Sequence, residues 1–233
     1  MAQILARREP FTAVKPSILI TGFGPFPGVE VNASGVLVAR LARTARRRFP
    51  GVSVHSAILP TEWRRGLARA QGALDRMQPD IAIHFGVSPK AQGFVIEQRG
   101  VNSCQTLADG AGHLPPLDVL DAVGPKARAS TLPVAAIVAR LGACGLPAVV
   151  SDDAGTYLCN AVLYQTLGIR RGGLPLTAGF VHVPAVLGGD GALTFQQAVA
   201  GSLEIIAVCV ETADLWPDPC FAGAIDLTPT EPS

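Results

Sequence analysis

The chain of 233 residues contains no hydrophobic run long enough to cross a lipid bilayer. Its longest apolar runs, such as Val134 to Val138 and Ile205 to Val210, are far shorter than the roughly 20 residues of a transmembrane helix. Arg7 and Arg8 near the N-terminus are not followed by the apolar stretch of a secretory signal. The sequence therefore predicts a cytoplasmic protein without a membrane partner.

An excess of charge of one sign is also missing. The 19 Lys and Arg residues nearly balance the 18 Asp and Glu residues, so the formal net charge is +1. Such a chain has no overall field to attract nucleic acid or an anionic membrane, and we expect a small, neutral partner instead.

Paired cysteines are missing as well. The count is odd and no two cysteines lie close together in the sequence: Cys104, Cys144, Cys159, Cys209 and Cys220. This spacing argues against a disulfide framework and against a CxxC metal or redox site. We expect reduced thiols, as in the cytosol.

What the sequence does contain is the pattern of one α/β domain. Apolar, β-branched segments alternate with segments of helical period, which favours a three-layer α/β/α sandwich with a mostly parallel (mixed) twisted sheet. Strands are expected at 17–21, 52–59, 80–86, 94–101, 146–150 and 177–183. Two helices are expected at 63–77 and 134–141. Two more are expected to begin at 32 and at 194, and a fifth is expected to follow AGTYLC at 154–159 and to end at about 167. The expected organisation is a loose N-terminal tail at 1–16, one domain at 17–216 and a Pro-rich tail at 217–233.

Two helix starts carry capping signals, and one long segment carries none. Thr61 could cap the helix at 63–77, and Thr194 with Gln197 forms the pattern of a capping box. Residues 102–130 have few periodic signals and many Gly, Pro and Asp residues, which predicts a long loop. We expect this loop to be a lid or an oligomer contact.

Cys159 lies where a nucleophile is expected, because ligands of open α/β sheets bind beyond the carboxyl ends of the strands. It follows a predicted strand end at Ser151, and Gly155 and Thr156 place it in the first turn of a helix. The helix dipole and the free N–H groups there favour a thiolate and could stabilise an oxyanion. A lone cysteine is more often a buried structural residue, and this alternative stays open.

His182 and Glu97 are the candidate partners of this cysteine. His182 lies at the end of the predicted strand 177–183 and is the natural base, although a core histidine is the alternative. Glu97 interrupts the apolar face of segment 94–101, where pairing with an imidazolium would offset the cost of burying a carboxylate. A salt bridge to Arg99 or to another surface cation is the alternative for Glu97. Three histidines are less well placed: His55, His84 and His113.

The first predicted strand ends in the glycine and proline cluster GFGPFPG at 22–28, where a functional loop could begin. A phosphate loop, and hence a nucleotide-binding protein, is one interpretation. GxxxxGK[ST] is absent, however, and Pro25 and Pro27 lack the N–H donors that a phosphate would need. Phe23 and Phe26 beside glycines fit a pocket for a small apolar ring better.

Three segments carry the most specific information: TGFGPFPGVEVNAS at 21–34, SDDAGTYLCN at 151–160 and GFVHVP at 179–184. The first resembles TGFxPFxG…VNxS, the N-terminal motif of the pyroglutamyl peptidase I family, the pyrrolidone-carboxylate peptidases of cysteine peptidase family C15. The other two resemble the nucleophile and histidine segments of that family, and Glu97 falls where the family has its glutamate. The resemblance spans nearly the whole chain.

This resemblance implies a phosphorylase/hydrolase-like fold and a thiol protease, an omega peptidase that removes N-terminal pyroglutamate from peptides. It implies that Cys159 attacks the pyroglutamyl carbonyl, that His182 acts as base and then acid, and that Glu97 orients His182. Phe23 and Phe26 would line the pocket for the pyrrolidone ring. The resemblance implies no metal or organic cofactor, and it predicts a homo-oligomer, a homotetramer. A quiet ligand-binding relative and a hydrolase of another small cyclic amide remain the alternatives.

Overall fold

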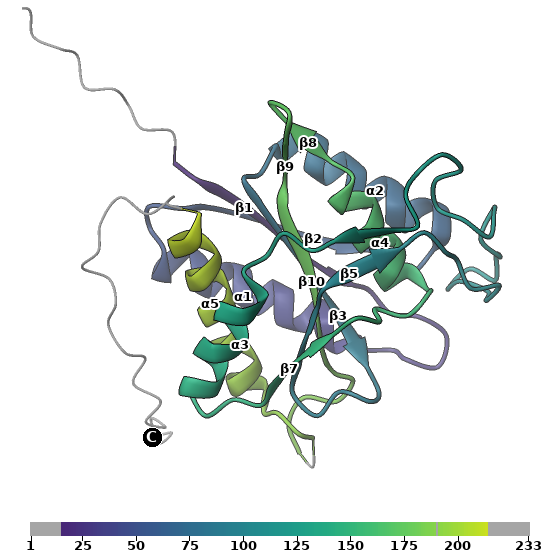
Figure 1. The fold of residues 1–233 in the computed structure, drawn as a ribbon. Coiled ribbons are helices and arrows are strands. Elements are labelled where there is room, and N and C mark those ends of the chain that lie inside the picture. The colour runs from purple at the N-terminus through teal and green to yellow at the C-terminus, as the bar shows by residue number, and fades with distance from the viewer. Residues whose placement is uncertain (1–14, 190, 214–233) are drawn as a thin grey trace, which may run out of the picture.

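The computed structural model describes residues 15–189 and 191–213, so the predicted tails, apart from residues 15 and 16, lie outside the described residues. Helices cover both faces of a central sheet (Figure 1), which confirms the three-layer α/β architecture. The helices of the described part are α1 (Ala33–Arg48), α2 (Trp63–Met77), α3 (Val134–Ala143), α4 (Leu158–Leu167) and α5 (Phe195–Thr212). No helix in this part is both long enough and apolar enough to span a membrane.

The central sheet has six strands in the order β2-β1-β3-β10-β4-β7. They are β1 (Ser17–Phe23), β2 (Ser53–Leu59), β3 (Ile81–Ser88), β4 (Phe94–Glu97), β7 (Ala148–Ser151) and β10 (Thr177–Pro184). All neighbouring strands are parallel except β10 and β4, which are antiparallel. Two small antiparallel sheets pair β5 (Arg99–Val101) with β6 (Ala127–Ala129) and β8 (Arg170–Arg171) with β9 (Leu174–Pro175).

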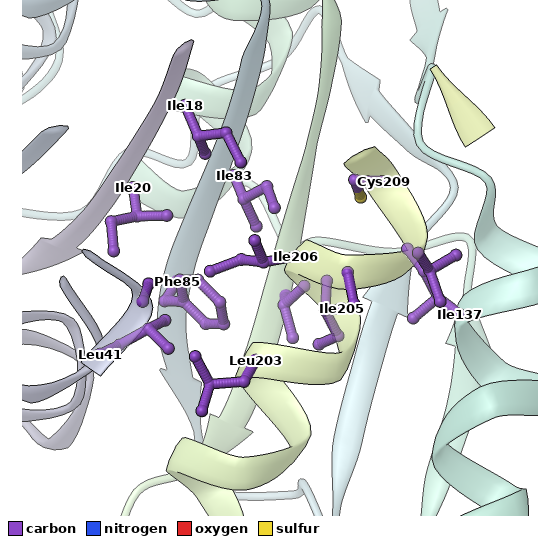
Figure 2. Close-up of a cluster of buried hydrophobic side chains, with 14 of the residues drawn as sticks. Ile18, Ile20, Leu41, Ile83, Phe85, Ile137, Leu203, Ile205, Ile206 and Cys209 are labelled. Carbon is purple, nitrogen blue, oxygen red and sulfur yellow. The ribbon is translucent and has the colours of Figure 1, made fainter. Parts of the chain in front are cut away.

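Each face of the sheet has its own hydrophobic cluster, because successive side chains of a strand point to opposite faces. The cluster under α1, α3 and α5 contains Ile20, Ile83 and Ile206 (Figure 2). The cluster under α2 and α4 contains Leu19 and Ala82, the neighbours of Ile20 and Ile83 along β1 and β3. Burial of one large aliphatic side chain contributes about 1.5–3 kcal/mol, so the two clusters hold the helices on the sheet.

The strand predicted over 94–101 is divided into two strands. Gln98 separates β4 from β5, and β5 pairs with β6 outside the central sheet. Gly100 permits this departure, because a Cβ there would lie 2.8 Å from the backbone nitrogen of Tyr164 in α4. The predicted loop 102–130 contains β6 and is otherwise irregular.

One of the two predicted helix caps is present. In the capping box of α5, Thr194 Oγ1 accepts a hydrogen bond from Gln197 N at 3.1 Å, as predicted. Thr61 does not cap α2, and its hydroxyl donates to a carbonyl of the 22–28 loop instead. Asp109 supplies the missing cap from the long loop, because its Oδ2 accepts from Trp63 N at 2.8 Å.

Candidate active site

Glu97, Cys159 and His182 lie on one face of the sheet, the face that α2 and α4 cover. Glu97 ends β4, His182 lies in the neighbouring strand β10, and Cys159 lies in the first turn of α4. In the antiparallel register of these strands, Phe180 is opposite Glu97 and His182 is opposite Val95. The carboxylate and the imidazole therefore extend from adjacent strands, two residues apart in register.

The Glu97 carboxylate pairs with the His182 imidazole. The distance from Glu97 Oε1 to His182 Nδ1 is 2.7 Å, and their side chains are only 1% and 8% exposed. The alternative of a Glu97–Arg99 salt bridge is not realised, since the Arg99 guanidinium donates to the backbone oxygen of Asp152. The other oxygen, Glu97 Oε2, is buried without a hydrogen-bond partner in the described part of the chain.

The pKa of His182 depends on burial and on two neighbours, Cys159 and Glu97. Burial lowers this pKa, because it disfavours the charged ring. The charge and hydrogen bond of Cys159, followed by those of Glu97, outweigh burial and raise the pKa to about 10. The imidazolium is therefore favoured at neutral pH and gives the Cys159 sulfur a cationic neighbour. A cysteine sulfur beside an imidazolium can act as a nucleophile.

The turn before α4 is built by its own side chains. Ser151 Oγ accepts from Asp153 N at 3.0 Å, and Asp153 Oδ1 accepts from Gly155 N at 2.9 Å. Gly155 has φ +74°, a left-handed conformation that favours glycine. Tyr157, the N-cap of α4, makes no side-chain capping bond. The first-turn N–H groups around Cys159 thus have no side-chain cap and could stabilise an oxyanion.

Asn160 anchors α4 directly after the nucleophile candidate. The Asn160 side chain is buried, its Oδ1 accepts from Val101 N at 2.7 Å, and its Nδ2 donates to Val101 O at 2.8 Å. The same nitrogen donates to Ser103 O at 3.1 Å. Sequence reasoning missed this role, and the only signal was the place of Asn160 beside Cys159 in the SDDAGTYLCN segment.

Phe180 is a second residue that sequence reasoning missed. Its ring centroid lies 4.8 Å from that of His182 and 6.3 Å from that of Phe23. Phe23 is thus connected to the candidate site through Phe180, and it is itself buried. Phe26 is half-buried, and its backbone forms a bridge with Val29. The sequence did contain a signal for Phe180: it precedes His182 by two residues, and this spacing places both side chains on one face of the strand.

His84 is the core histidine of this face. Its Nδ1 lies 2.7 Å from Thr21 Oγ1 and its Nε2 lies 3.0 Å from Thr166 Oγ1, so it bridges β1, β3 and α4. Complete burial lowers the pKa of His84 to about 4, which keeps the ring neutral. Both ring nitrogens of His84 are engaged in these hydrogen bonds, so neither is available for proton transfer to a substrate.

The site offers thiol chemistry rather than a ready-made metal centre. The described residues contain no group of three or more His, Cys, Asp or Glu side chains placed to hold a metal ion. A cysteine sulfur, an imidazole, a carboxylate bonded to that imidazole and helix N–H groups without a cap from the Tyr157 side chain are groups that acyl transfer through a thioester could use.

Comparison with known proteins connects this geometry to an enzyme family. A family model described as pyroglutamyl peptidase matches residues 16–211. The pyrrolidone-carboxylate peptidase of Mycobacterium tuberculosis is 34% identical over 212 residues, which cover 85% of this chain and 94% of the relative. The enzyme of the same name from Chromobacterium violaceum is 38% identical over 169 residues, 72% of this chain and 77% of that protein.

Solved structures give the same result for the fold. A mutant pyrrolidone carboxyl peptidase from Pyrococcus furiosus matches with a TM-score of 0.77 and 27% identity, over 84% of this chain and 99% of that chain. Pyroglutamyl peptidase I from Bacillus amyloliquefaciens matches with a TM-score of 0.74 and 27% identity, over 84% and 97% of the two chains.

Proposed function

The chain belongs to the pyroglutamyl peptidase family, and we propose that it is a cysteine exopeptidase that hydrolyses the N-terminal pyroglutamyl residue from peptides. The single observation that carries the catalytic part of this proposal is the buried Glu97–His182 pair, whose imidazole interacts with Cys159 at the start of α4. These are the residue types and contacts that a thiol hydrolase needs.

In the proposed reaction, Cys159 Sγ attacks the carbonyl carbon that joins pyroglutamate to the next residue. His182 then donates its proton to the leaving amine, the C–N bond breaks, and the pyroglutamyl group remains on sulfur as a thioester. The neutral imidazole takes a proton from water, which attacks the thioester and releases pyroglutamate. Glu97 orients His182 and stabilises its charged form. The amides at the start of α4 stabilise the oxyanion.

The pyrrolidone ring is a flat, neutral group that suits aromatic walls. We place Phe23 and Phe26 along this ring, as the resemblance implies. The contact of Phe23 with Phe180, and of Phe180 with His182, supports this placement because it connects the glycine and proline loop to the reacting groups. Peptides with an N-terminal pyroglutamate are the proposed substrates.

We also propose a cytoplasmic homotetramer, in which residues 17–216 form the peptidase domain. Family membership supports this assembly, and the reduced cysteines support the compartment, since the four cysteines within the described residues are unpaired. Sedimentation-velocity ultracentrifugation of the purified protein tests the assembly, and a monomer at micromolar concentration would contradict it.

The activity is tested with pyroglutamyl-aminomethylcoumarin, whose hydrolysis releases a fluorophore. We expect release by the wild-type protein, no release by Cys159→Ala, and unchanged release by Cys144→Ala, which removes an exposed thiol instead. Iodoacetamide should label Cys159 before the other cysteines. Tight binding of pyroglutamate analogues without turnover, or faster hydrolysis of another small cyclic amide, would contradict the proposal.

A further inference from the structure

Cys159, the nucleophile candidate, packs against β3 at Gly86, a residue without a side chain. Gly86 is opposite His182 in the register of β3 and β10. An ideal Cβ built on Gly86 would lie 3.0 Å from Cys159 Sγ, a separation at which the neighbouring atom has to give way. The sulfur therefore packs into the space that a side chain at position 86 would occupy, beside the strand that carries its base.

The Phe180 ring fills the rest of this space. The same Cβ would lie 2.6 Å from Cζ and 2.8 Å from Cε1 of Phe180, distances that real Cβ atoms essentially never show. Phe180 is fully buried and contacts the His182 ring, with centroids 4.8 Å apart. The ring is thus held between the glycine and the imidazole, and a side chain at Gly86 would displace the ring and the sulfur together.

We propose that Gly86 and Phe180 are positioning residues for the thiolate–imidazolium pair. This inference rests on the proposed function. The absence of a side chain at Gly86 sets how deeply the Phe180 ring and Cys159 Sγ lie against the sheet, and this depth sets the distance from the sulfur to His182. The attraction between the two charges and the proton transfer both depend on that distance.

The first test is Gly86→Ala. A displacement of about 1 Å in a catalytic group can cost 10²-fold in rate, so we expect kcat to fall by about that factor while KM changes little. The rate at which iodoacetamide alkylates Cys159 near neutral pH should fall as well, and its pH profile should move toward that of an ordinary thiol. Unchanged kcat together with an unchanged alkylation profile would overturn the proposal.

A second variant, Phe180→Leu, tests the same proposal if Gly86→Ala does not fold. Phe180→Leu removes the aromatic ring and leaves an apolar side chain, so the ring that shares the space beside Gly86 with Cys159 Sγ is lost. We expect a smaller fall in kcat and a shifted alkylation profile. In the double variant, the leucine frees space for the new methyl group, so alkylation should be faster than in Gly86→Ala alone. Wild-type profiles in both Phe180→Leu and the double variant would contradict the proposal.

Gly201→Ala is the matched control. A Cβ at Gly201 would lie 2.5 Å from two atoms of the Phe94 ring, so the variant introduces a similar clash in the hydrophobic cluster on the other face of the sheet. We expect a lower Tm with a wild-type alkylation profile. Alkylation needs no pyroglutamyl substrate, so this readout tests the positioning role even if the wild-type protein fails the coumarin assay and the proposed function is wrong.

Discussion

Glu97 and His182 form an ion pair on two neighbouring strands of one sheet, so their contact is held by backbone as well as by charge. Folding raises the pKa of His182 from 6.5 to about 10. The neighbours of His182, first Cys159 and then Glu97, therefore give this histidine a stabilising contribution that is fully present below pH 6.5 and is lost as the pH rises through about 10. The imidazolium that the proposed reaction needs is lost over the same pH range, as the pH rises through about 10.

Replacing Glu97 with glutamine should shift the alkaline limb of activity to lower pH. Glutamine keeps the shape but removes the negative charge that favours the imidazolium, so His182 loses its proton at lower pH. The profile of kcat/KM against pH measures this shift. Glu211→Gln, which changes a surface partner of Arg140 in the same way, should keep the wild-type profile. An unmoved limb in Glu97→Gln would contradict the pairing.

Substitutions that remove a reacting group should lower activity more than the loss of Glu97 does. Cys159→Ala should abolish hydrolysis and His182→Ala should nearly abolish it, because Cys159 and His182 can still react without the carboxylate. Equal losses in all three positions would contradict this ranking.

His84 should make the protein less stable in mild acid. The pKa of this histidine is about 4 in the folded chain and 6.5 when exposed, so the unfolded chain binds a proton first as the pH falls. Between pH 6.5 and 4 the free energy of unfolding should decrease by up to about 3 kcal/mol from this group. Urea unfolding at pH 7.5 and 4.5 measures the decrease, which should be smaller in His84→Gln. If the free energy of unfolding decreases equally in the wild-type protein and in His84→Gln, His84 is not the source of the decrease.

Among the elements, α2 and α5 begin with different kinds of cap. Thr194 caps α5 from within its own sequence, whereas Asp109 caps α2 from a loop 46 residues away. Asp109 also accepts from Ala111 N and His113 N, both at 2.9 Å. Burial raises the pKa of Asp109, but these three backbone N–H groups outweigh it and hold the pKa below its usual value. The stabilising contribution of Asp109 is present above that usual value and is lost as the pH falls through the lowered pKa.

Asp109→Ala should therefore cost more stability than Thr194→Ala. Loss of the α5 cap should lower the free energy of unfolding by about 1 kcal/mol. Loss of Asp109 leaves the buried N–H group of Trp63 without its partner, at about 1–3 kcal/mol, and also removes the bonds to Ala111 N and His113 N that hold the loop 102–130. Urea unfolding and limited proteolysis measure the two effects. If proteolysis cuts both variants alike, Asp109 does not hold the loop.

This long loop reaches the start of α4. Tyr157 OH donates to Ala108 O at 3.2 Å, and Gln105 N donates to Thr156 O at 2.7 Å. The loop is thus bonded to the residues just before Cys159. Its predicted roles as a lid or an oligomer contact stay predictions, and the same proteolysis measurement, repeated with a pyroglutamate analogue, tests the first of them.

At the scale of the whole molecule, the family model matches residues 16–211, and the single domain at 17–216 stays a prediction. We expect a protein of residues 15–216 to keep kcat/KM within about twofold of the full chain, because the predicted tails, apart from residues 15 and 16, lie outside that range. Coumarin release by the shortened and full-length proteins measures this. A much lower kcat/KM with an unchanged Tm would assign a functional role to a tail.

The sheet topology corrects one step of the sequence reasoning. Cys159 was selected because carboxyl ends of parallel strands meet at one edge, but β7 runs opposite to β10, since β4 pairs antiparallel with β10 and parallel with β7. The carboxyl ends of β7 and β10 are therefore at opposite edges. Cys159 reaches His182 because α4 packs on β3 and β10 across the face of the central sheet, and on β5 outside that sheet.

By itself the sequence determined the types of the main elements, the three-layer class, the family and the three candidate reactive residues. These depend on local period, on helix and strand ends and on short motifs. Only the tertiary structure decided the Glu97–His182 pairing across 85 residues, the Asp109 cap, and the packing of Cys159 and Phe180 against Gly86. The physical reason is that these contacts depend on strand register and on close approach between distant segments, and no local pattern of residues encodes either.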